Sequence, residues 1–168
     1  MKLRKELDEI SEIVDKIVSS ICIVLTAIMF VAVLYQVFGR YVISTSIAWT
    51  EETARYCMIW LAFLGASMLV RSSENSAVTF IIDKCSAKKR RILNIVIQGF
   101  MLIFMLTIFI ISLDQTQYSL NEISPALRIS MFIPKSSILF GSLLVSLQLV
   151  WKIIDSTLEM KEEWEGEK

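Results

Sequence analysis

Residues 17–39 read IVSSICIVLTAIMFVAVLYQVFG, which is 23 residues without a charged side chain between Lys16 and Arg40. At 1.5 Å per residue, an α-helix of this length measures roughly 34 Å and can cross a hydrocarbon core of about 30 Å. The run is longer than a signal-peptide core, and no small-residue cleavage site follows it before Arg40. It therefore predicts a transmembrane helix.

Three further stretches extend this pattern along the chain. Residues 92–113 also carry no charge, whereas 56–70 and 136–151 reach spanning length only with their flanks. The composition agrees, with 55% hydrophobic residues and a mean hydropathy of +0.61. We expect an all-α integral membrane protein with one domain at 17–154, formed by transmembrane helices near 17–39, 50–70, 91–113 and 133–154.

The two ends of the chain are charged. In residues 1–16, apolar residues recur at intervals of three and four, which predicts an amphipathic helix on the cytoplasmic side. Two interpretations stay open for this segment. It either lies on the membrane surface or on a partner, or it is a solvated extension of the first span. We expect residues 155–168 to form a charged cytoplasmic tail.

The basic residues are unevenly distributed. Thirteen of the 17 lie in residues 1–16, in the 71–91 loop and after residue 151. Because basic residues concentrate in cytoplasmic loops, this asymmetry predicts that both termini and the 71–91 loop are cytoplasmic. We expect the chain to cross its membrane several times, with these segments on the cytoplasmic side.

The absence of histidine narrows the possible functions. It excludes Ser-His and Cys-His catalysis, most catalytic zinc sites and axial histidine ligation of haem. The three cysteines show no metal-site spacing. We therefore expect no enzyme activity, no metal or other cofactor, and no nucleic-acid partner.

Polar residues are densest at Trp49-Thr50-Glu51-Glu52-Thr53-Ala54-Arg55-Tyr56. Glu51 and Arg55 are four residues apart and can pair on one helix face. A structural ion pair at the outer membrane interface is one interpretation, and a proton-carrying carboxylate at Glu51 or Glu52 is the other. The expected polar anchor or partner interface comprises Arg40, Trp49, Glu51, Glu52, Arg55 and Tyr56.

Small residues recur in the second and fourth predicted spans, at Ala62, Gly65 and Ala66 and at Ser137 and Gly141. Such residues allow close helix packing, either within the domain or against another membrane subunit. No span has an Asp, Glu, Lys or Arg residue or a Gly/Pro break at its centre, which are the usual features of transport sites. We therefore expect that this chain alone binds no transported substrate.

Several of these motifs occur together in one known family. Gly39-Arg40-Tyr41, the 49–56 motif, Trp60-Leu61-Ala62-Phe63-Leu64-Gly65-Ala66 and the later Ser124-Pro125-Ala126-Leu127-Arg128-Ile129 resemble the small membrane (Q, DctQ-type) subunit of tripartite ATP-independent periplasmic (TRAP) transporters. The similarity covers residues 17–154. The sequence departs from the family pattern in two places. A His-Ile-x-Val-Asp-like stretch is replaced by Asn75-Ser76-Ala77-Val78-Thr79, and Lys135 replaces an expected glycine.

The resemblance implies a sodium-driven symporter for an organic acid such as a C4-dicarboxylate, a sialic acid or a similar carboxylate. The small subunit would scaffold a large membrane (M) subunit in the inner membrane, and a periplasmic substrate-binding protein would deliver the substrate. The alternative from the residues themselves is a small homodimeric, proton-coupled exporter that uses Glu51 or Glu52.

Overall fold

The computed structural model describes residues 2–42, 44, 47–72 and 87–166. It contains four long α-helices, α1 (Lys2–Tyr41), α2 (Ala48–Ser72), α4 (Ala87–Tyr118) and α5 (Phe132–Gly166), together with the short 3-10 helix η1 (Ser119–Asn121). Within the described ranges the β-structure is limited to one isolated bridge, between Ile123 and Ser130. The predicted all-α fold with four transmembrane helices is confirmed.

The stretches long and apolar enough to span a membrane are Ser11–Tyr41, Ala48–Val70, Ile92–Asn121 and Phe132–Thr157. Each contains the greater part of one predicted span and differs from it only at its ends. The helices continue beyond the spans because charged residues are tolerated once a helix has left the bilayer. As a result, α1 runs without a break from Lys2, and residues 2–16 form one helix with the first span.

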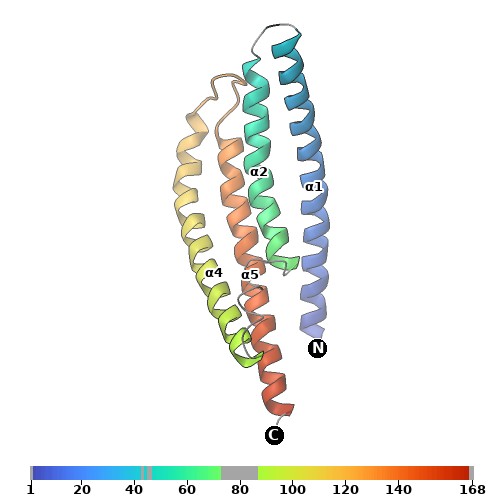
Figure 1. The fold of residues 1–168 in the computed structure, drawn as a ribbon. Coiled ribbons are helices and arrows are strands. Elements are labelled where there is room, and N and C mark those ends of the chain that lie inside the picture. The colour runs from blue at the N-terminus through green and yellow to red at the C-terminus, as the bar shows by residue number, and fades with distance from the viewer. Residues whose placement is uncertain (1, 43, 45–46, 73–86, 167–168) are drawn as a thin grey trace.

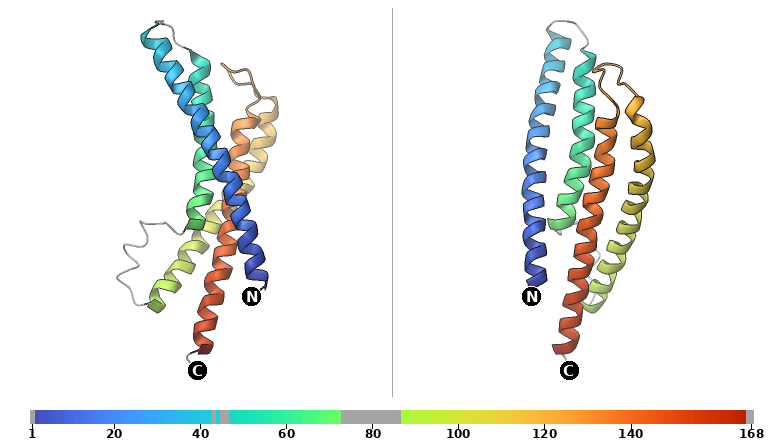
Figure 2. Two further views of the ribbon diagram at one scale, coloured as in Figure 1. Left: turned by 90° about the vertical axis from the view of Figure 1, so that its right-hand side faces the viewer. Right: turned by 180° about the vertical axis from the view of Figure 1, so that it is seen from behind.

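The helices lie side by side in the order α1, α2, α5, α4 (Figures 1 and 2). The neighbours α1 and α2 are antiparallel, as are α5 and α4, whereas α2 and α5 run in the same direction. Thus α1 packs along α2, α2 along α5, and α5 along α4. The two outer helices of this row are the most apolar and the least covered, since α1 and α4 each bury only 11% of their most apolar window. Much of their surface is therefore available to lipid or to other membrane proteins.

The core lies where α2, α5 and α4 meet. Val70, Val145 and Leu149 are buried there, and the partly buried side chains packed against them are Ala66, Met101, Leu102 and Met105. At the same end of α2, the Lys152 ammonium donates a hydrogen bond to the Val70 carbonyl across 2.7 Å. The Val70 carbonyl lies in the last turn of α2 and therefore has no hydrogen-bond partner within its own helix. The Lys152 side chain of α5 supplies this partner.

The small residues predicted to pack do not share one interface. A Cβ atom at Gly141 would lie 2.3 Å from the Cβ of Phe63, so α2 and α5 approach closely there, whereas a Cβ at Gly65 would meet nothing within 4 Å. Ser137 is buried, but Ala62 is exposed. Gly141, Ser137 and Ala66 therefore pack inside the domain, and Ala62 and Gly65 leave part of α2 open.

Both chain ends lie at one end of the row, together with the last turn of α2 and the first turn of α4 (Figure 1). The helix ends that carry the basic segments are therefore on one side, as the predicted topology requires. Residues 73–86 of the 71–91 loop lie outside the described residues. The membrane side on which this end lies stays a prediction.

Candidate functional site

The polar cluster forms where α2 begins, at the end of the molecule opposite the chain termini (Figure 1). Thr50 is fully buried, and its hydroxyl donates to the Ile47 carbonyl across 2.7 Å, which fixes the first turn of α2. Immediately after it, Glu51 and Glu52 point to different surroundings, because successive helical residues are about 100° apart.

Glu52 is buried, with 7% of its surface exposed. Its Oε2 atom accepts hydrogen bonds from the backbone amides of Ala126 (3.0 Å) and Leu127 (2.7 Å). Its Oε1 atom accepts one from the hydroxyl of Tyr56, one helical turn further along α2. Hydrogen bonds to an ionised carboxylate are about twice as strong as neutral ones, so this side chain fastens α2 to the loop before α5.

The loop between η1 and α5 is folded so that these two amides are available. Ser124 donates its backbone N–H to the Ile129 carbonyl (2.8 Å), and the Ser124 hydroxyl accepts the Ile129 N–H (3.3 Å). Arg128 adopts φ 53°, a left-handed conformation that is uncommon for a residue with a side chain. The turn that results leaves the amides of Ala126 and Leu127 for Glu52.

Two further contacts connect α2 with the beginning of α5. The Met131 sulfur lies 3.2 Å from the Tyr56 hydroxyl oxygen. The indole Nε1 of Trp60 donates to the Ile133 carbonyl across 3.2 Å, and this carbonyl is in the first turn of α5. Glu52, Tyr56 and Trp60 therefore form a continuous line of contacts, which we name the outer clamp.

Glu51 and Arg55 form the ion pair that their spacing predicts, with 2.9 Å between Oε1 and the guanidinium. Both side chains are mostly exposed, at 63% and 59%. Trp49 packs against Tyr35 of α1 with ring centroids 5.7 Å apart, and Arg40 lies exposed in the last turn of α1. The predicted cluster thus divides into a buried clamp, an exposed ion pair and two residues at the α1 side.

The sequence interpretation missed the partners of Glu52. Ala126, Leu127 and Met131 contribute backbone amides and a thioether, and none of these groups has a charge or a spacing that identifies it. The only signal was the 124–129 segment, which resembles the same family as the 49–56 motif. That likeness did not show that the two segments touch.

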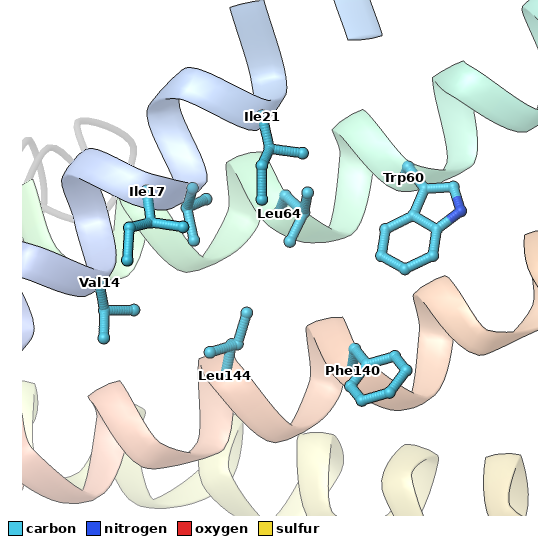
Figure 3. A pocket seen from close by; sticks show the side chains of 8 residues that line it. Val14, Ile17, Ile21, Trp60, Leu64, Phe140 and Leu144 are labelled. Atoms are coloured by element: carbon cyan, nitrogen blue, oxygen red, sulfur yellow. The ribbon is translucent and has the colours of Figure 1, made fainter. Parts of the chain in front are cut away.

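The hydrogen bonds of Glu52 favour a structural role for this carboxylate over proton transfer. Both carboxylate oxygens of Glu52 accept hydrogen bonds, and the described residues contain no group of three or more His, Cys, Asp or Glu side chains that could hold a metal ion. A hollow between α1, α2 and α5 is lined by apolar side chains, among them Ile17, Ile21, Leu64 and Phe140 (Figure 3). It offers no polar group to an organic acid.

Comparison with known proteins gives one consistent family. Residues 13–158 match the model of the DctQ component of tripartite ATP-independent periplasmic transporters. The chain is 29% identical to a TRAP transporter small permease protein of Haemophilus influenzae, over 88% of this chain and 91% of the relative. It is 26% identical to the sialic acid TRAP transporter small permease protein SiaQ of Vibrio cholerae, over 51% of this chain and 49% of the relative.

A third relative combines two subunits in its name. The isethionate TRAP transporter permease protein DctMQ of Oleidesulfovibrio alaskensis is 30% identical over 105 residues, which are 60% of this chain and 16% of the relative. The family match covers most of the chain, and the four apolar helices agree with it. The chain is therefore a multi-pass bacterial inner-membrane protein and belongs to the DctQ family, the small permease subunits of TRAP transporters.

Proposed function

We propose that this chain scaffolds the large membrane subunit of a sodium-driven TRAP symporter for an organic acid, with both of its own termini in the cytoplasm. The outer clamp supports this proposal most directly. Its buried carboxylate is fully used in holding α2 to the loop before α5, so it contributes rigidity and no exchangeable proton site. The apolar hollow beside α2 likewise gives no place for a charged substrate.

The names of the relatives support the choice of partner and substrate class. One relative is a sialic acid transporter subunit, and another is a DctMQ permease for isethionate, whose name joins the M and Q components. Sialic acid and isethionate are both organic acids. The present chain would accordingly act beside a large M subunit and a periplasmic substrate-binding protein, which would carry the determinants of substrate choice.

The exposed Glu51–Arg55 pair is the part of the predicted anchor that remains available to a partner. It lies at the same end of α2 as the outer clamp, and it is exposed where Glu52 is buried. In an interface that excludes water, such charges fix orientation more than they add affinity. We therefore assign partner recognition to Glu51 and Arg55 and internal rigidity to Glu52 and Tyr56.

Co-purification with the M subunit tests this assignment. Glu51→Ala and Arg55→Ala should each lower recovery of the M subunit, and uptake with it, by about fivefold or more, on the scale of a charge contact at an interface. Lys16→Ala is the matched control, because Lys16 and Glu12 form an exposed i,i+4 pair of the same kind, 2.8 Å apart, near the opposite end.

Two results would contradict the proposal. Unchanged assembly and uptake in both variants would remove the anchor role of the ion pair. Transport by the purified chain alone in liposomes would instead support the homodimeric exporter that uses Glu51 or Glu52.

A further inference from the structure

The hollow between α1, α2 and α5 has the character of a hydrocarbon site. Figure 3 shows Val14 of α1 opposite Leu144 of α5 at one end, and Trp60 of α2 opposite Phe140 of α5 at the other. The two rings are stacked, with centroids 6.5 Å apart and planes inclined by 20°. All the helices that line the hollow are long and apolar enough to span a membrane.

Next to the end near Val14, a polar bridge connects α1 and α5. The side-chain amide of Gln148 on α5 donates to the Asp15 carboxylate on α1 across 3.2 Å. Gln148 is one turn beyond Leu144, so α1 and α5 come within the reach of two side chains just where the hollow ends. A transmembrane helix with its side chains is about 10–12 Å wide and cannot enter between these walls. A single hydrocarbon chain is much thinner and can.

The length of the hollow also suits part of an acyl chain. From Val14 to Ile21, which line the hollow, the axis of α1 rises by about 10 Å. Apolar surface in such a hollow is stabilised when hydrocarbon covers it, because voids lose dispersion contacts on one side. A chain in this position would contact both α1 and α5 and hold α1 against the three helices that share the core.

The bridge lies at the depth of lipid headgroups. Asp15 and Lys16 are the last charged residues of α1 before the uncharged run that crosses the bilayer. The bridge carries an acceptor group, because Asp15 is a carboxylate. A negative group with acceptors is complementary to a cationic amine.

We propose that this hollow binds one acyl chain of an amine-bearing phospholipid, whose headgroup lies beside Asp15. The lipid acts as a wedge between α1 and α5. It extends the packing of α1 beyond its contact with α2, and it does so whether or not the chain scaffolds an M subunit.

Native mass spectrometry of the purified full chain tests this proposal. After exchange into equal amounts of phosphatidylethanolamine and phosphatidylglycerol, one phospholipid should stay bound, with about a fivefold preference for phosphatidylethanolamine, the scale of one charge near a membrane surface. Leu144→Phe fills the hollow and should lower the bound fraction about tenfold, as expected when two buried methylene groups lose their contacts. Asp15→Asn keeps an acceptor for Gln148 and should retain the lipid without the preference.

Controls separate this site from general lipid binding and from misfolding. Leu106→Phe makes the same change on the exposed surface of α4 and should leave lipid binding unchanged. Ile17→Phe fills the hollow from the opposite wall and should repeat the effect of Leu144→Phe if both variants keep their helical content. A wild-type chain without bound lipid, or lipid binding as strong as wild type in both filled variants, would overturn the proposal. Loss of the lipid in the complex with the M subunit would overturn it too, because a partner side chain would then be the occupant.

Discussion

At the scale of single residues, two adjacent glutamates have opposite environments. Glu52 is buried and accepts three hydrogen bonds, whereas Glu51 is exposed and pairs with Arg55. Sequence alone treats them alike, because both are acids at the beginning of the predicted second span, beside Trp49. What separates them is a pair of backbone amides about 75 positions later in the chain, at Ala126 and Leu127.

This difference predicts unequal effects of the same conservative change. Glu52→Gln keeps the shape of the side chain but removes its charge and places an NH2 group against donors. It should lower the thermal unfolding midpoint by roughly 3–8 °C, since buried partners are left unsatisfied. Glu51→Gln should change the midpoint by less than about 2 °C, because exposed ion pairs contribute little.

Thermal unfolding of both variants in the same detergent measures this contrast. Tyr56→Phe supplies a second check, because it removes only the hydroxyl that donates to Glu52. Tyr56→Phe should lower the unfolding midpoint by more than Glu51→Gln does and by less than Glu52→Gln does. Equal midpoints for Glu51→Gln and Glu52→Gln would show that the outer clamp does not stabilise the fold.

At the scale of the helices, the sequence predicts that the four membrane spans exist, but it does not predict which helices pack against each other. The four spans follow from length and from the absence of charge, so each predicted range lies almost entirely within one apolar stretch, although the ends differ by up to eight residues. The order α1, α2, α5, α4 could not be predicted, because spans that are apolar nearly all round do not indicate which face packs. Of the small residues, Gly141 and Ser137 pack within the domain, whereas Ala62 and Gly65 leave open the alternative of contact with another subunit.

Two glycines predict opposite responses to the same substitution. Gly141→Ala places a Cβ atom within 2.3 Å of Phe63 and should destabilise the α2–α5 contact by about 1–3 kcal/mol. Gly65→Ala enters open space and should be neutral or stabilise α2 by up to about 1 kcal/mol, since alanine favours the helix. Both effects are measurable as changes in the free energy of unfolding.

The pair of glycines also tests the partner surface. Since Gly65 and Ala62 lie on an open part of α2, a loss of M-subunit binding in Gly65→Ala without any loss of stability would place that surface in the interface between subunits. A stable Gly141→Ala variant with intact α2–α5 packing would contradict the close approach described above.

At the scale of the whole molecule, the row of helices has two chemically different ends. One end carries both chain termini and the basic segments, and the other carries the outer clamp and the loop before α5. Each basic residue near an anionic inner leaflet is stabilised by about 1 kcal/mol of electrostatic free energy. Summed over the basic residues at one end, this free energy is large compared with that of any single contact in the fold. We therefore expect charge, and not packing, to decide the orientation of the chain in the membrane.

Cysteine labelling in intact cells tests this orientation. In a chain whose three native cysteines are replaced by serine, Asn121→Cys should react with a membrane-impermeant maleimide, because Asn121 is exposed beside the loop of the outer clamp. Thr157→Cys, exposed near the far end of α5, should react only after the inner membrane is opened. Labelling of both in broken membranes is the control for accessibility. The reverse pattern in intact cells would place the termini outside, and with them it would turn the Glu51–Arg55 pair away from any periplasmic partner.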